Sequence, residues 1–259
     1  MKPESIDEDS NGRLADALGR LKTTGCSLLV VGDVPLSLHR RACRQLLGAE
    51  NGGRRRLIAN VDDFGCSPSD LQSFEQHVAD RLRILHQPLV TSRAPSTADR
   101  TSVGADRPIS ADDSTSTPID RIHSASEPPT PPRTGVDVHL TDDGIDTLGI
   151  AISREIAGFE VLSGGPEPGE IRLCVSSARP LVDRHGRERV FRFLHLLGQR
   201  LRTVRGMGHT HYPEPIDSDT TRIFETVTDA TVELGIEDAT PVHRWHLRYP
   251  ALTTDWMAL

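Results

Sequence analysis

A short, uninterrupted apolar run near the start of the chain, Ser27-Leu-Leu-Val-Val-Gly32, constrains the fold more than any other feature. A strand that is apolar at consecutive positions has no side for water, and such strands belong to parallel sheets that are covered on both faces. An amphipathic segment, Leu36 to Leu47, follows the run and ends at Gly48. A buried strand that leads directly into a helix predicts a fold built from crossover units around a parallel sheet.

The rest of the chain repeats this alternation of strands and helices. The residue pattern predicts strands over residues 56–61, 171–177, 206–211 and 230–234, and a half-exposed edge strand over 242–249. It predicts helices over residues 13–23, 69–85, 145–157, 190–204 and 218–227. We therefore expect an α/β fold with a mostly parallel sheet that is flanked by helices.

Two polar segments interrupt this pattern. Residues 1–12 are expected to form a disordered tail. Residues 92–135 are rich in Pro, Ser, Thr and Asp and contain no aromatic residue, so they cannot bury enough apolar area to offset the entropy lost on ordering. We expect one domain over residues 13–259 that is interrupted by this disordered insertion, and we interpret the insertion as tolerated sequence.

The residues after the first strand decide whether the chain can bind a nucleotide in the usual way. A phosphate-binding loop reads GxxxxGK[ST]: backbone amides wrap the phosphates, the lysine neutralises them, and the hydroxyl holds magnesium. Counted from Gly32, the second glycine is replaced by Ser37. Leu38 stands in the lysine position and His39 in the hydroxyl position, while Asp33 adds a charge that repels phosphate. The loop is therefore degenerate.

The second half of an ATPase site is a carboxylate at the end of a later strand, where it positions magnesium and water. The predicted strand over residues 171–177 has Ser176 at that place. The joint loss of lysine, hydroxyl and carboxylate predicts a protein without standard ATPase activity. We expect no cofactor, and the sequence leaves weak binding of ATP open.

Four segments resemble the KaiC/RecA-like phosphate-loop proteins that are abundant in haloarchaea: Gly25–Gly32, Ile145–Ser153, Leu173–Leu181 and Arg189–His195. More narrowly, the chain is similar to uncharacterised members of this group with degenerate loops. The resemblance implies a RecA-type parallel sheet and, for relatives with intact loops, ATP-dependent regulatory or recombination roles. Because the lysine, hydroxyl and carboxylate positions depart from the family pattern, the resemblance implies the scaffold without the ATPase chemistry.

The sequence favours a cytoplasmic protein. No stretch approaches the roughly 20 apolar residues that cross a bilayer, and the start MKPESIDEDS lacks a signal core. The net charge of −7 suits a soluble chain. The four cysteines, Cys26, Cys43, Cys66 and Cys174, form no CxxC pair, as expected of reduced thiols. We interpret Cys26 and Cys174, which lie in apolar runs, as small buried hydrophobes.

Residues 179–205 hold eight arginines and two acidic residues. They offer a candidate interaction surface for nucleic acid or an acidic partner, with Arg189, Arg192, Arg200 and Arg202 as its contact residues. We favour a different interpretation, in which these arginines lie on the solvated side of a helix and pair with acidic residues elsewhere in the chain.

Two histidine pairs, His209-x-His211 and His243-x-x-His246, are weak candidates for a metal site, because alternating residues of a strand share a face. No cysteine or carboxylate spacing accompanies them. We interpret them as packed or polar histidines and predict no metal.

Three hypotheses for function follow. The leading one is a non-catalytic RecA/KaiC-like regulatory or scaffolding module that binds protein partners or a second copy of itself. The second is a divergent ATPase that uses histidine or arginine in place of the missing groups. The third is a nucleic-acid-binding regulator that uses the arginine-rich segment over residues 179–205.

Overall fold

The computed structural model describes residues 7–48, 53–61, 81–88, 136–140 and 142–259 of the chain. These residues belong to one compact unit, Met1–Leu89 with Thr134–Leu259. A second unit, residues 90–133, lies outside the described residues, as does the predicted insertion over 92–135.

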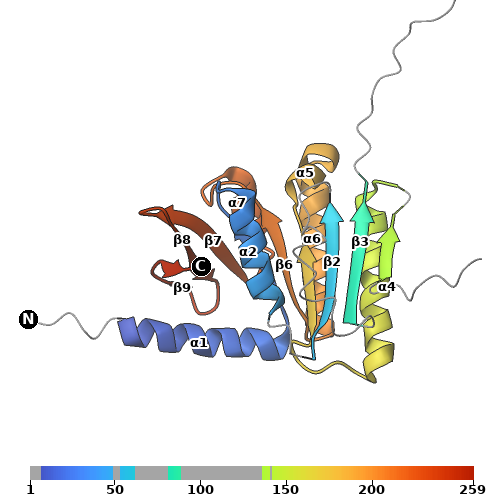
Figure 1. Ribbon diagram of the computed structural model, residues 1–259, viewed down its shortest axis with the longest axis horizontal. Coiled ribbons are helices and arrows are strands. Elements are labelled where there is room, and N and C mark those ends of the chain that lie inside the picture. The colour runs from blue at the N-terminus through green and yellow to red at the C-terminus, as the bar shows by residue number, and fades with distance from the viewer. Residues whose placement is uncertain (1–6, 49–52, 62–80, 89–135, 141) are drawn as a thin grey trace, which may run out of the picture. The chain divides into compact units, whose positions relative to one another are not determined.

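The unit is built around a 10-stranded sheet with the order β10-β8-β7-β1-β6-β5-β2-β3-β4, in which β9 pairs with β8 (Figure 1). From β7 to β4 every neighbouring pair is parallel, whereas β8 runs antiparallel to β7, β9 and β10. The strands are β1 (Cys26–Val31), β2 (Arg55–Val61), β3 (Leu82–Gln87), β4 (Val136–His139), β5 (Ile171–Val175), β6 (Met207–Tyr212), β7 (Ala230–Glu237), β8 (Thr240–Leu247), β9 (Leu252–Thr253) and β10 (Met257–Ala258).

Helices cover both faces of this sheet (Figure 1). The helices are α1 (Asp7–Thr24), α2 (Leu36–Leu47), α4 (Ile145–Ser163), α5 (Arg179–His185), α6 (Arg187–Thr203) and α7 (Asp219–Glu225). Among the residues described, no helix combines the length and the apolar character that crossing a membrane requires.

The expected class, an α/β fold with a mostly parallel sheet flanked by helices, is confirmed. The predicted helix over residues 36–47 is α2, and the predicted strands over 56–61 and 171–177 are β2 and β5. All five residues of β5 are buried. The continuous apolar runs were informative because parallel strands covered on both faces leave no position for a polar alternation.

Three elements differ from the prediction. Residues 82–85, predicted as the end of a helix, begin β3, where the apolar Leu82 and Ile84 are buried on one face between β2 and β4. Helix α1 begins at Asp7, upstream of the predicted helix start at residue 13. The predicted edge strand, β8, is covered on its outer side by β9 and β10, which are each two residues long and too short to leave a sequence pattern.

The two faces of the sheet differ in chemistry. The face under α4, α6 and α7 packs a large apolar cluster that includes Phe159, Phe224 and Leu173, each at most 1% exposed. The face under α2 buries polar side chains among apolar ones: His209, His211 and Ser176 are each at most 4% exposed. Because buried polar groups cost free energy unless they find partners, this second face is where a site is expected.

Candidate functional site

The loop from β1 to α2 begins at Gly32, at the carboxyl edge of a central strand. Ligands of open α/β sheets bind at this edge. Gly32 has a φ angle of 133°, and its amide donates to the carbonyl of Glu214 at 2.9 Å. The loop is short, since the four residues from Gly32 to Pro35 connect β1 directly to the first residue of α2. The segment predicted to be a degenerate phosphate loop therefore connects β1 to α2 at this edge of the sheet.

The loop residues do not present the groups that a phosphate would need. Leu38, in the lysine position, is half-buried and packs against the apolar cluster of β1, β7 and β8. The amide of Leu38 donates to the carbonyl of Pro35 at 2.9 Å, and proline itself has no amide to offer. Asp33 and Ser37 are exposed to solvent.

His39 closes the space beneath this loop. Its side chain is 2% exposed, its Nε2 lies 3.0 Å from the carbonyl oxygen of Gly32, and its Nδ1 lies 3.1 Å from Nδ1 of His211. A carbonyl only accepts, so Nε2 of His39 carries the proton. Burial lowers the pKa of His39, so the ring is neutral and its Nδ1 accepts. The donor to it is then Nδ1–H of His211.

This chain of hydrogen bonds fixes the second ring nitrogen of His211. Burial, with the neighbouring rings of His209 and His39, holds the pKa of His211 well below its ordinary value, so its ring is neutral too. With its proton on Nδ1, Nε2 carries a bare lone pair. That atom is buried and has no hydrogen-bond partner among the described residues.

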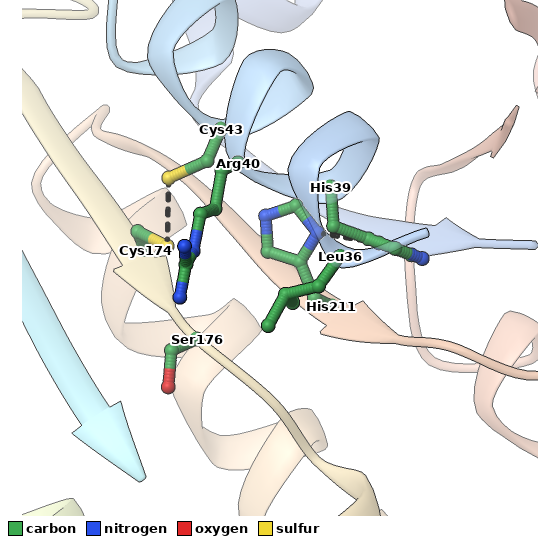
Figure 2. A pocket seen from close by; sticks show the side chains of 7 residues that line it. All are labelled: Leu36, His39, Arg40, Cys43, Cys174, Ser176 and His211. Atoms are coloured by element: carbon green, nitrogen blue, oxygen red, sulfur yellow. Dashed lines mark hydrogen bonds between the residues drawn. The ribbon is translucent and has the colours of Figure 1, made fainter. Parts of the chain in front are cut away.

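A cavity of about 10 Å³ lies between α2 and the ends of β5 and β6. Figure 2 shows the side chains that line it, among them His39, Arg40, Cys43 and Cys174. The volume is comparable with the minimum needed for one water molecule, about 10–15 Å³. The cavity therefore suits a single small species and excludes a nucleotide.

Ser176, at the predicted position of the magnesium carboxylate, makes hydrogen bonds to the backbone of β2. Its hydroxyl accepts a hydrogen bond from the amide of Val61 at 2.8 Å, and its own amide donates to the carbonyl of Ala59 at 2.9 Å. The side chain is 4% exposed. Ser176 therefore joins the ends of β5 and β2.

Four buried side chains gather beside His39. Cys43, Cys174, His209 and His211 each offer a ligand atom, and these atoms all lie within 4.8 Å of one another. Cys43 comes from α2, Cys174 from β5, and the two histidines from β6. The thiol of Cys43 donates to the sulfur of Cys174 at 3.1 Å, so the two cysteines are in contact as thiols and not as a disulfide.

From sequence, His209 and His211 were weak metal candidates together with His243 and His246, and Cys174 was interpreted as a small buried hydrophobe. His243 and His246 lie on β8, which is separated from β6 by β7 and β1, so the two histidine pairs do not meet. His246 instead contacts Glu233 at 2.8 Å. The usable signal was the spacing of His39 and Cys43, four residues apart on one side of a helix, but the register that sets Cys174 opposite His209 needs the sheet.

Three of the four arginines of the candidate surface form ion pairs with acidic residues outside α6. Arg189 pairs with Asp146 at 2.8 Å, Arg200 pairs with Glu160, and Arg202 pairs with Asp229 at 3.0 Å. Arginines paired in this way match the solvated-helix interpretation. Arg189 and Arg192 also line the rim of a groove between α4 and α6.

This α4–α6 groove has a volume of about 680 Å³. Its floor is apolar, with Phe193 facing Gly149, and Ile150 and Leu196 stand at its sides with 62% and 64% of their surface exposed. Its charged lining residues are Asp146, Arg154, Arg189 and Arg192.

Comparison with known proteins adds a family to this description. A family described as "Family of unknown function (DUF7504)" matches residues 25–234. The chain belongs to this family. Its matched span begins just before β1 and ends within β7, so it covers the loop, the Cys/His cluster and the α4–α6 groove.

A comparison with curated proteins finds no match. Among solved structures, the chain is similar to the crystal structure of a KaiC-like protein from the hyperthermophilic archaeon Pyrococcus horikoshii OT3. The TM-score is 0.49 and the sequence identity is 11%, over 87% of this chain and 79% of that chain.

Proposed function

We propose that the protein is a non-catalytic, pseudo-ATPase module of the RecA/KaiC type that regulates or scaffolds by binding a protein partner. The observation that carries this proposal is the closed state of the β1–α2 loop. His39 bonds the carbonyl of Gly32 from below, and Leu38 packs into the core where a lysine would reach the phosphates. Because the fold is retained without these reactive groups, we propose that its surface binds the partner.

The loop leaves little to hold a phosphate. A lysine contact to a phosphate in a partly buried site contributes on the order of several kcal/mol, and leucine removes it. The neutral ring of His39 supplies no replacement charge, because burial lowers its pKa. Ser176 is committed to the backbone of β2 and is not an acceptor for magnesium.

Titration calorimetry with Mg-ATP tests the loss of nucleotide chemistry. We expect no saturable heat at micromolar nucleotide and no release of phosphate from the full chain. Micromolar binding together with turnover would overturn the proposal. In that case the His39→Ala variant, assayed under conditions where circular dichroism shows it folded, separates the alternatives, since a divergent ATPase that relies on His39 loses its turnover.

For the partner, we propose an amphipathic helix that carries acidic side chains and docks in the α4–α6 groove. Most of the residues that line the groove are apolar, which suits the apolar face of a helix. Three arginines and one aspartate line it, so its charge favours an acidic segment over a second copy of this chain, whose own arginines would face these.

Two synthetic peptides test this docking site. They share one apolar helical face and carry either glutamate or lysine on the other face. We expect the acidic peptide to bind the full chain at least about tenfold more tightly, which corresponds to about 1.4 kcal/mol. Fluorescence anisotropy measures both affinities, and equal affinities would contradict the proposed charge preference.

A matched pair of variants ties the binding to the groove. Ile150 and Val161 are both exposed apolar residues of α4, but only Ile150 lines the groove. Ile150→Glu should weaken the acidic peptide about tenfold or more, whereas Val161→Glu should leave its affinity within about twofold. If sedimentation shows that the chain dimerises and Ile150→Glu abolishes the dimer, the occupant is a second copy and the acidic-partner proposal is wrong.

A further inference from the structure

The Cys/His cluster has the donor set of a structural zinc site. Two thiols and two imidazoles are the ligands of closed tetrahedral sites, in which all four positions belong to the protein. Cys43, Cys174, His209 and His211 are each at most 3% exposed. The sequence paired His209 with His211 but joined neither to the two cysteines, because the four residues come from three separate elements.

The backbone explains how these side chains meet. Cys174 on β5 is the register partner of His209 on the neighbouring parallel strand β6. His209 and His211 are two residues apart on that strand and therefore project from the same face. Helix α2 packs against both strands on this face and brings Cys43 over them.

We propose that Cys43, Cys174, His209 and His211 bind one Zn²⁺ ion in a closed tetrahedral site. With Zn–S near 2.3 Å and Zn–N near 2.0–2.1 Å, the donor atoms of such a site lie about 3.3–3.8 Å apart. The four donors of this cluster already lie within 4.8 Å of one another, and the two sulfurs are 3.1 Å apart. Movements on the order of 1 Å complete the geometry.

His211 is oriented for this role. Its Nδ1 bonds His39, which in turn bonds the carbonyl of Gly32, so Nε2 remains as the ligand atom. That atom is buried without a hydrogen-bond partner among the described residues, and Figure 2 shows this side of the ring facing the cavity that Cys43 and Arg40 line. A ligating histidine that bonds a second group through its other nitrogen is the usual arrangement around zinc. His39 is thus a positioning residue.

The ion would fasten α2 to β5 and β6, immediately behind the loop that a nucleotide would have organised. Two thiolates balance the charge of Zn²⁺. Four protein ligands leave no position for substrate, so the site is structural. This inference is independent of whether the α4–α6 groove binds a partner.

Metal analysis of the full chain is the direct test. After purification from zinc-supplemented medium and dialysis, we expect about one equivalent of zinc per chain by mass spectrometry of the element, as one tetrahedral site requires. Replacement with Co²⁺ should give the intense visible bands of tetrahedral cobalt and a near-ultraviolet thiolate charge-transfer band. A chain that folds but takes up neither metal overturns the proposal.

Cysteine variants locate the site. Cys43→Ala should lose the zinc and the cobalt charge-transfer band, and Cys26→Ala should keep both. The two positions are matched, because both are thiols no more than 1% exposed, and Cys26 lies on β1 outside the cluster. Burial raises the pKa of the Cys26 thiol to about 12, so it remains a protonated thiol.

If a cysteine variant fails to fold, the zinc proposal can still be tested on the unmodified chain. Chelator should strip the metal and lower the melting temperature, and added zinc should restore it. Intact mass then distinguishes the remaining outcome: a chain that is isolated metal-free with Cys43 and Cys174 joined as a disulfide contradicts the zinc proposal.

Discussion

Replacing Gly32 with alanine is expected to lower the free energy of unfolding by roughly 2–6 kcal/mol, from backbone strain and overpacking together. The φ angle of 133° is one that residues with a side chain rarely adopt. A Cβ atom at this position would lie 2.5 Å from the carbonyl oxygen of Leu234. That oxygen is backbone in β7, which pairs with β1, so it cannot move aside without disturbing the sheet. Urea unfolding followed by circular dichroism measures the change.

Gly164 provides the matched control. It too has a positive φ angle, 67°, but an added Cβ there meets nothing within 4 Å. Gly164→Ala should therefore cost only the strain of the left-handed conformation, about 1–2 kcal/mol. If the two variants lose the same stability, close contact with β7 is not what requires glycine at residue 32.

The sheet could be predicted from sequence because its strands carry their own signal. Leu29 and Val31 face the apolar cluster under α4 and α6, while Leu28 and Val30 face the cluster on the other side. A strand covered on both faces must be apolar at every position, and a run of such residues is visible without a structure. β2 and β5 carry a shorter form of the same signal, at residues 57–59 and 173–175.

The short and polar elements could not be predicted in this way. β9 and β10 are formed by pairing with β8, and a two-residue strand has no periodicity of its own. The start of β3 was assigned to the end of a predicted helix over residues 69–85. Only the neighbouring strands β2 and β4 decide between the two.

The site shows the same limit more sharply. The prediction that Leu38 stands in the lysine position could be made directly, because a phosphate loop is a contiguous motif. The contacts among the side chains behind the loop could not be predicted. His39, His211 and Cys174 come from three elements that meet only in the folded sheet. Cysteine and histidine in apolar runs look like core residues until the register brings them together. His39, which stands in the predicted hydroxyl position, thus also makes the contact to His211 that organises the cluster.

Replacing His39 with alanine is therefore expected to destabilise the protein rather than to free the loop. The change leaves the Gly32 carbonyl and Nδ1–H of His211 without their hydrogen-bond partner in a buried place. Each buried group left unsatisfied costs about 1–3 kcal/mol, so the expected loss in the free energy of unfolding for the two groups is roughly 2–6 kcal/mol. Urea unfolding of the His39→Ala variant beside the unmodified chain measures it.

His246→Ala is the control that separates this effect from the loss of any histidine. His246 bonds Glu233 at 2.8 Å, but Arg244 bonds the same carboxylate at 2.6 Å, so the glutamate keeps a partner when the histidine is removed. The pair is near the surface, where such contacts contribute about 0–1 kcal/mol. A small effect at His246 beside a large one at His39 would show that the imidazole behind the loop is a structural part of the sheet edge. Equal effects would mean that His39 only fills space, and the hydrogen-bond chain from Gly32 to His211 would no longer explain why the loop is closed.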